Sequence, residues 1–129
     1  MAVGLFKVGE KYTRAQVASK VALPPKLQGG NWNTGYRVWG GQVYVFCNVG
    51  TAGRTGHDYD NRWVENQLEW YGKTGTHRHQ PLIKKMISGE LEVHVFWRSK
   101  DSEPFTYAGV GRADEVSDSK PVRLRWTFN

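Results

Sequence analysis

Residues 122–128, VRLRWTF, are the stretch of sequence that determines the expected fold. Apolar side chains occupy every second position, and Arg123, Arg125 and Thr127 fill the positions between them. Side chains two positions apart on an extended strand lie on the same face of a sheet. The alternation therefore predicts a strand with one face in a hydrophobic core and two guanidinium groups on the other.

Further strands are expected before this one in the chain. Residues 42–48 (QVYVFCN) are β-branched and aromatic, which predicts a strand buried on both faces. Residues 91–97 and 105–110 have a similar composition and predict two more strands. Residues 62–71 fit either a strand or a helix.

Two short helices are expected, over residues 12–23 and 80–89. Thr13 and Gln16 have the spacing of a capping box, in which a hydroxyl and an amide satisfy backbone N–H groups at the start of a helix. Gly89 is a residue type that commonly follows the end of a helix. Glycine-rich stretches are expected outside these elements, with residues 27–41 as a loop or hairpin and residues 51–63 as a loop.

The balance of elements favours an α+β fold that is mainly β. Strands concentrated late in the chain, with too few helices to cover a parallel sheet, favour a curved antiparallel sheet or a partly closed barrel with two short helices at its edges. The length of 129 residues fits a single domain over residues 1–129. No apolar run approaches the ~20 residues of a membrane span, and the single cysteine, Cys47, excludes an internal disulfide. We therefore expect a cytoplasmic protein with no membrane partner.

Charge indicates the class of partner. Lys and Arg number 18 against 12 Asp and Glu, for a formal net charge of +6, and the chain also has six Trp and six Tyr. A basic, aromatic-rich small domain suggests nucleic acid as the partner. The alternative is a basic surface that only keeps the domain soluble.

No motif in the sequence supports catalysis. His77 and His79 would point to opposite sides of a strand, and no third ligand lies at the spacing of a metal site. Cys47 falls within a predicted strand, where a small core residue is a better interpretation than a nucleophile. Phosphate-binding glycine motifs and a nucleophile elbow are absent from the sequence. We expect a protein that is not an enzyme and that uses no metal or cofactor.

Aromatic residues also occur in predicted loops, where rings are exposed or line a cavity. A nucleobase can stack on such rings, and a neighbouring carboxylate or carboxamide can read its hydrogen-bonding edge. Packing in the core is the alternative for each ring, and a local turn is the alternative for Asp60. The predicted base pocket comprises Tyr36, Trp39, Tyr59, Asp60, Asn61, Trp70 and Tyr71.

Phosphate contacts give nucleic-acid binding most of its affinity, and base contacts give it selectivity. The cationic residues gather in a few stretches of the sequence. The side chains expected to contact a DNA backbone are Tyr12, Arg14, Arg62, Lys73, His77, Arg78, Lys84 and Lys85.

Several short motifs resemble a known family. They are V-G-x-x-Y-x-R at 8–14, Y-D-x-x-W at 59–63, L-E-W-Y-G-K at 68–73, V-H-V-F-W-R at 93–98, P-F-T-Y-A-G at 104–109 and K-P-V-R-L-R-W at 120–126. Together they resemble a domain of bacterial restriction-type helicases and nucleases that is related to the SRA domains and the wider PUA-like barrels, which read modified bases in DNA. The resemblance extends from about Lys7 onward. Where the family's central motif has Ser-Gln, this chain has Gly72-Lys73.

The resemblance implies a DNA-reading module without a catalytic centre, normally joined to a nuclease or helicase domain. It gives functional roles to Tyr12, Arg14, Tyr59, Asp60, Trp70 and Tyr71. The expected function is recognition of a modified base in double-stranded DNA, a C5-modified cytosine, by flipping it into an aromatic pocket. An RNA-binding PUA-like module and a protein-interaction or inhibitor domain are the alternatives.

Overall fold

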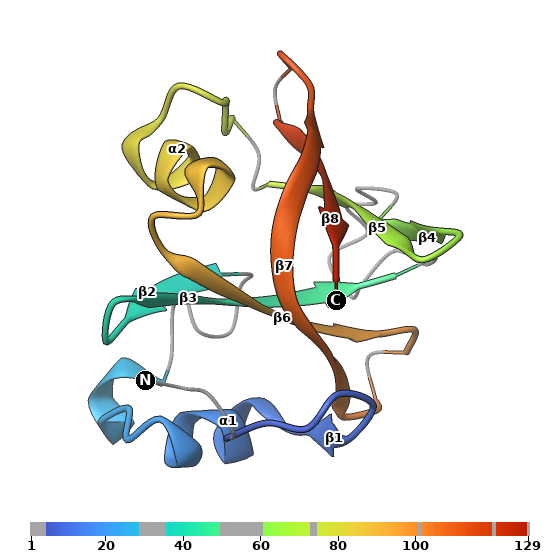
Figure 1. Ribbon diagram of the computed structural model, residues 1–129. Helices are drawn as coiled ribbons and strands as arrows, with labels where there is room; N and C mark the ends of the chain where they lie inside the picture. The colour runs from blue at the N-terminus through green and yellow to red at the C-terminus, as the bar shows by residue number, and fades with distance from the viewer. Residues whose placement is uncertain are drawn as a thin grey trace.

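A computed structural model describes residues 5–28, 36–49, 61–72, 75–100, 102–119 and 121–128. Over these residues the chain forms one open, curved sheet of eight strands with two α-helices, which confirms the predicted α+β, mainly β class (Figure 1). The elements in chain order are β1 (Lys11–Tyr12), α1 (Arg14–Lys20), a 3-10 turn (Pro25–Leu27), β2 (Tyr36–Trp39), β3 (Gln42–Asn48), β4 (Arg62–Val64), β5 (Gln67–Tyr71), α2 (Pro81–Ser88), β6 (Glu92–Arg98), β7 (Phe105–Val116) and β8 (Arg123–Thr127). Neither described helix is long and apolar enough to cross a membrane.

The strand order is β2-β3-β6-β7-β8-β5-β4, and β1 pairs with the start of β7. Neighbouring strands are antiparallel with one exception, the parallel pair of β3 and β6. The curved sheet is therefore mixed, and the other neighbouring pairs among the described strands are antiparallel, as expected. The chain leaves β3, passes through β4, β5 and α2, and returns to the same end of the sheet, and so long a crossover permits parallel pairing.

The β3–β6 part of the sheet is buried on both faces, as predicted for β3. Val43, Val45 and Cys47 face one hydrophobic cluster, while Tyr44 and Phe46 face another. Figure 1 shows α2 and α1 on opposite sides of these strands. We call the two clusters the α2-side core and the α1-side core.

The α2-side core lies between the β3–β6 strands, α2 and the inner face of β5 and β8. Ile83 and Met86 of α2 enter it, and Leu124 and Trp126 of β8 are fully buried there. The predicted alternation in residues 122–128 is thus confirmed, and it leaves Arg123 and Arg125 on the opposite face of the sheet.

The α1-side core is rich in phenylalanine and tyrosine rings. Val17 and Ala18 pack it from α1, and Phe96 and Phe105 pack it from the sheet. The predicted capping box begins α1: the Thr13 hydroxyl accepts a hydrogen bond from the Gln16 backbone N–H at 3.1 Å, and the Gln16 amide oxygen accepts one from the Thr13 N–H at 2.9 Å.

Candidate functional site

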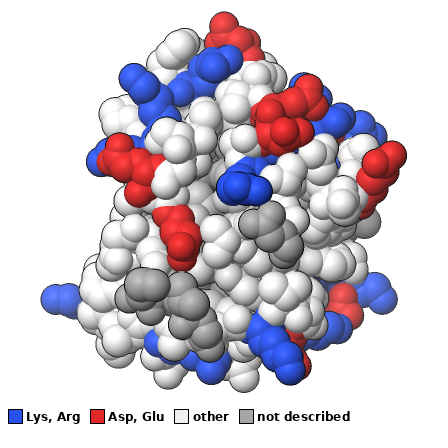
Figure 2. All heavy atoms as spheres, viewed as in Figure 1, with Lys and Arg blue, Asp and Glu red and all other residues white. Residues whose placement is uncertain are grey.

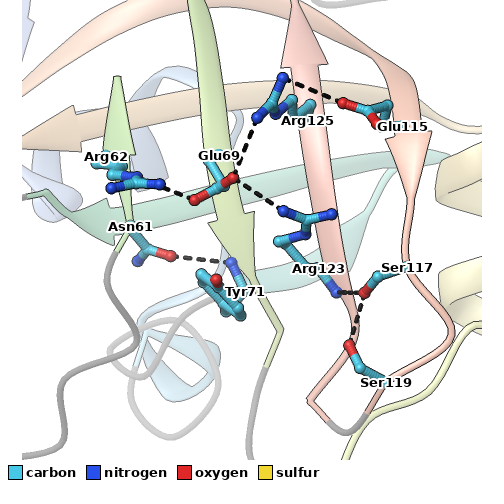
Figure 3. Close-up of polar contacts among 9 residues, drawn as sticks. All are labelled: Asn61, Arg62, Glu69, Tyr71, Glu115, Ser117, Ser119, Arg123 and Arg125. Carbon is cyan, nitrogen blue, oxygen red and sulfur yellow. Dashed lines mark hydrogen bonds and ion pairs between the residues drawn. The ribbon is translucent and has the colours of Figure 1, made fainter. Parts of the chain in front are cut away.

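A buried carboxylate surrounded by arginines lies on the outer face of β4, β5 and β8 (Figure 3). The Glu69 side chain is only 3% exposed. Its Oε2 lies 3.1 Å from Nε of Arg62, and its Oε1 lies 3.1 Å from Nη1 of Arg123 and 3.5 Å from Nη2 of Arg125. We call these four residues the arginine–glutamate face.

The register of the strands brings these residues together. Glu69 on β5 is directly opposite Arg62 of β4 on one side and Arg125 of β8 on the other. Because Leu68 and Trp70 on either side of Glu69 are buried in the α2-side core, Glu69 must lie on the other face of the strand. Each charge therefore has its nearest neighbour one strand away.

Electrostatics keep Glu69 ionised. Burial alone would raise the pKa of the Glu69 carboxyl, but the hydrogen bond and charge of Arg62, with the charges of Arg123 and Arg125, hold it below its usual value. Glu115 on β7 is a second carboxylate at the edge of the cluster, 3.1 Å from Nη1 of Arg125. Three guanidinium groups thus meet two carboxylates.

The arginines are fixed in position and still reach solvent. Their side chains are 64% exposed for Arg62, 33% for Arg123 and 27% for Arg125. A guanidinium group has five N–H donors in a planar arrangement that matches phosphate and carboxylate oxygens. The face can therefore offer ordered donors to an anion without losing its contacts to Glu69.

Two residues of the predicted base pocket adjoin this face. Tyr71 follows Glu69 by two positions on β5, so it lies on the same outer face, and it is half-buried. The Asn61 amide donates to the Asn48 carbonyl at 3.1 Å and accepts from the Tyr71 N–H at 2.9 Å. Asn61 therefore ties the end of β3 to the start of β4 and to β5, which is a structural use of the amide predicted to read a base.

Three predicted pocket rings do not share a slot. Tyr36 and Trp70 are 7% and 2% exposed, and their rings meet edge to face at 5.4 Å in the α2-side core. Trp39 is three positions from Tyr36 on β2 and packs against the α1-side core instead, with its indole N–H donating to the Val21 carbonyl at 2.9 Å. Alternation along β2 places Tyr36 and Trp39 in different cores, so these three rings do not line one common slot.

The predicted backbone contacts are spread over three parts of the molecule. Arg62 belongs to the arginine–glutamate face, Tyr12 and Arg14 lie at the start of α1, and His77, Arg78, Lys84 and Lys85 lie in or just before α2. Figure 2 shows basic and acidic side chains close together over the viewed surface rather than one continuous basic area. Tyr59, Asp60 and Lys73 lie outside the described residues.

Within the turn before α2, His77 and His79 contact each other. Nδ1 of His77 accepts a hydrogen bond from the His79 backbone N–H at 3.3 Å. No group of three His, Cys, Asp or Glu side chains that could hold a metal ion occurs among the described residues. The Cys47 thiol is buried, and burial raises its pKa to about 12, so it is a core residue and a poor nucleophile at neutral pH.

Sequence reasoning missed Glu69, the centre of the cluster. It placed two guanidinium groups on one face of residues 122–128 but did not assign them a partner. The signal was the glutamate between the two apolar residues Leu68 and Trp70, because a charged side chain there must lie on the outer face if the segment is a strand. Since residues 62–71 also fitted a helix, the pairing of strands remained open.

Comparison with known proteins gives one family. A search of curated proteins finds no significant match. The pattern of DUF3427, described as a domain of unknown function, matches residues 6–126, which include every described strand except the last residue of β8. The chain therefore belongs to the DUF3427 domain family.

Proposed function

We propose that this domain binds double-stranded DNA and that the arginine–glutamate face contacts the phosphate backbone. The observation that carries the proposal is one buried carboxylate that orders three arginines, each still partly exposed. The net charge of +6 favours a polyanionic partner in the same way.

The arrangement of the face suits phosphate better than it suits structural stability alone. Two carboxylates, Glu69 and Glu115, meet three guanidinium groups, so one positive charge is left over at the surface. Neighbouring strands lie about 4.8 Å apart, and the arginines come from β4 and β8 on either side of β5, so the donors are spread across the sheet. Because Glu69 already orders these side chains, they lose less conformational entropy when a phosphate binds.

We propose in addition that the domain selects a modified base, a C5-modified cytosine. The resemblance to SRA and PUA-like readers supports this part, as does the half-buried ring of Tyr71 beside the arginines. Stacking of one base on such a ring contributes about 1 to 3 kcal/mol. Tyr59 and Asp60 precede this region in the sequence and are the candidates for the remaining base contacts. The setting would be the cytoplasm, next to a nuclease or helicase domain.

The test is a titration of the protein with matched DNA duplexes at several salt concentrations, in which tryptophan fluorescence reports binding. If about five cationic side chains contact phosphate, log K falls with log salt at a slope near −4 to −5. Arg62→Gln should lower the affinity about three- to tenfold and reduce the slope by about one. Lys26→Gln, at an exposed lysine in the turn after α1, is the matched control and should leave the slope unchanged.

The duplexes separate the two parts of the proposal. One set carries a C5-modified cytosine and the other carries cytosine at the same place. Equal affinity for both would refute base selection and leave a general DNA-binding module. Stronger binding to matched RNA would favour the RNA-binding alternative, and salt-independent behaviour with no titration by any oligonucleotide would favour a protein-interaction domain.

A further inference from the structure

One aromatic ring lies on the outer face of the sheet beside the arginine–glutamate face. Tyr71 on β5 is directly opposite Arg123 of β8. The Cβ atoms of such cross-strand partners lie about 5 Å apart. Figure 3 shows Tyr71 next to Glu69 on β5, with Asn61 on one side and Arg123 on the other. The register of the strands therefore places a phenol ring one strand away from an ordered guanidinium group.

The fold holds Tyr71 in place without covering its ring with another ring or a cation. The Tyr71 backbone N–H donates to the Asn61 side-chain oxygen at 2.9 Å, and the residue is half-buried. Arg123 turns toward Glu69, with Nη1 3.1 Å from Oε1. None of the ring–ring or cation–π contacts within the described ranges includes Tyr71. The exposed part of the ring is therefore available to a ligand.

Stacking on Tyr71 would add a contact that charge alone does not supply. The arginine–glutamate face and Glu115 together carry one excess positive charge, and salt screens the attraction between exposed charges. A base that stacks on an aromatic ring needs no charge, and every base has a π-face. Tyr71 thus complements the arginines at the place where they can hold a phosphate.

A base reaches Tyr71 only when it is unpaired. Within a duplex each base stacks on its neighbours inside the double helix. Tyr71 is the half-buried last residue of strand β5, and a ring on a sheet face cannot enter that stack. An unpaired base has a free face that can lie on the ring. Its phosphate can then contact Arg123, one strand away.

We propose that the outer face of β4, β5 and β8 binds an unpaired stretch of a DNA strand, with one base on Tyr71 and its phosphate on Arg123. This inference rests on the proposed function, which it deepens by naming the form of DNA that binds best. That form is a duplex interrupted by a short single-stranded gap. Tyr71 then contributes affinity for any unpaired base, and selection of a modified base needs further contacts.

The test compares a continuous duplex with a duplex of the same sequence that lacks three nucleotides of one strand, and fluorescence anisotropy of an end-labelled strand reports binding. We expect the whole chain to bind the gapped duplex at least about fivefold more tightly, as one stacked base predicts. Tyr71→Leu should abolish this preference, and Tyr71→Phe, which keeps the ring, should retain it. Equal affinity of the unmodified protein for the two duplexes, or a preference that persists in Tyr71→Leu, would overturn the site.

A measurement on the unmodified protein does not depend on how well a variant folds. A 5-iodouracil base placed in the unpaired stretch forms a cross-link to a neighbouring aromatic side chain under ultraviolet light, and mass spectrometry identifies the residue. We expect the cross-link at Tyr71. A cross-link only to residues outside β4, β5 and β8 would overturn the site.

Salt dependence separates stacking from phosphate contact. For the gapped duplex, Tyr71→Leu should lower the affinity by the same factor at every salt concentration and leave the slope of log K against log salt unchanged. Arg123→Gln should instead reduce that slope by about one. A slope that changes in Tyr71→Leu and not in Arg123→Gln would contradict the roles given to the two side chains.

Failure of the proposed function and failure of this inference give different results. Binding of a free single strand that depends on Tyr71, without binding of either duplex, would refute the proposed function and support the site. Binding of both duplexes with equal affinity would refute the inference alone, and no binding to any of the three would refute both. Tighter binding of a single-stranded RNA of the same sequence would refute DNA as the ligand of the site.

Discussion

Glu69 and His94 are both almost fully buried, and the protein treats the two side chains in opposite ways. His94 on β6 is 1% exposed and lies within the α1-side core, whereas the Glu69 side chain on β5 is 3% exposed and lies at the centre of the arginine–glutamate face. Burial keeps His94 neutral although the carboxylate of Glu92 lies beside it, whereas three arginines keep Glu69 charged.

The surroundings of His94 favour the uncharged ring. Its Nε2 lies 2.9 Å from the Gln42 side-chain oxygen, which can only accept, so Nε2 carries the proton and Nδ1 accepts from the Tyr107 hydroxyl at 2.8 Å. Tyr44 stacks on the imidazole at 5.3 Å. Burial lowers the pKa of His94, and the opposing influence of Glu92, 3.2 Å from Nε2, does not overcome it.

The contrast separates a structural polar cluster from a candidate functional one. The hydrogen bonds of His94 are satisfied within the α1-side core, where the centroid of the Phe6 ring lies 6.1 Å from that of the imidazole. Glu69 instead lies under arginines that reach solvent, so a ligand can meet the charges that Glu69 orders. The cluster that keeps its charges is the one whose side chains a ligand can reach from the surface.

The largest expected effect on stability follows from replacing the ionised Glu69. Glu69→Ala leaves three arginines close together without their central carboxylate, and it should cost about 2 to 4 kcal/mol of unfolding free energy. Urea denaturation measures it. Glu115→Ala is the matched control, because Glu115 is 55% exposed and pairs with Arg125 at the edge of the cluster, and it should cost less than about 1 kcal/mol. Equal costs for the two variants would show that burial of Glu69 does not organise the face.

Replacing the neutral His94 should cost somewhat less unfolding free energy than replacing Glu69. His94→Leu fills a similar volume but leaves the Tyr107 hydroxyl and the Gln42 oxygen without the imidazole, which predicts a loss of about 1 to 3 kcal/mol. Adding Tyr107→Phe should then cost less than Tyr107→Phe alone, because the hydroxyl has already lost its partner. Additive costs in this double-mutant cycle would mean that the two side chains do not depend on each other.

The His94 and Glu69 clusters should also lose their contributions to stability in different pH ranges. The folded-state pKa of His94 is lowered, so the unfolded chain binds more protons below the ordinary value of 6.5, and stability should fall as pH drops through that value. The folded-state pKa of Glu69 is lowered from 4.5, so its contribution is full above that value and is lost as pH falls further.

Variants of His94 and Glu69 show which residue causes each decline in stability as the pH falls. Unfolding free energies measured by urea from pH 8 to pH 3 should lose the upper decline in His94→Leu and lose part of the lower decline in Glu69→Gln. A single decline that neither variant changes would contradict both assignments.

Much of the fold could be predicted from the pattern of apolar and polar side chains in the sequence. The turns that join the strands were harder to predict. The buried face of residues 122–128 followed from alternation, and the burial of β3 on both faces followed from its run of β-branched and aromatic residues. The β4–β5 hairpin did not, because its turn contains Glu65 with φ of 58°, a conformation that glutamate rarely adopts and that gave no signal. By contrast, Gly40 and Gly41, with φ of 60° and 79°, are the residue type expected in such a turn, although the sequence predicted only a loop or hairpin within residues 27–41 and no strand over Tyr36–Trp39.

The candidate site was less predictable than the fold, since it depends on which strands are neighbours. β7 extends to Val116, beyond the expected end at residue 110, because its second half is polar and pairs with β8. That second half brings Glu115 to Arg125. Contacts between residues as distant as Arg62 and Arg125 follow from strand order, which local patterns do not encode.

The smallest expected effect on stability is that of replacing Arg62, and it tests most directly how the Glu69 cluster differs from the His94 cluster. Arg62 is the most exposed of the three arginines, so Arg62→Gln should cost less than about 1 kcal/mol of stability, since water solvates what remains. In a Glu69→Gln background the same change should cost almost nothing, because its partner has lost the charge. Urea denaturation of the four proteins in this cycle gives the coupling energy. A coupling well above about 1 kcal/mol would mean that Arg62 is committed to Glu69 as firmly as His94 is to Tyr107, and a side chain so committed would have little freedom to contact a phosphate.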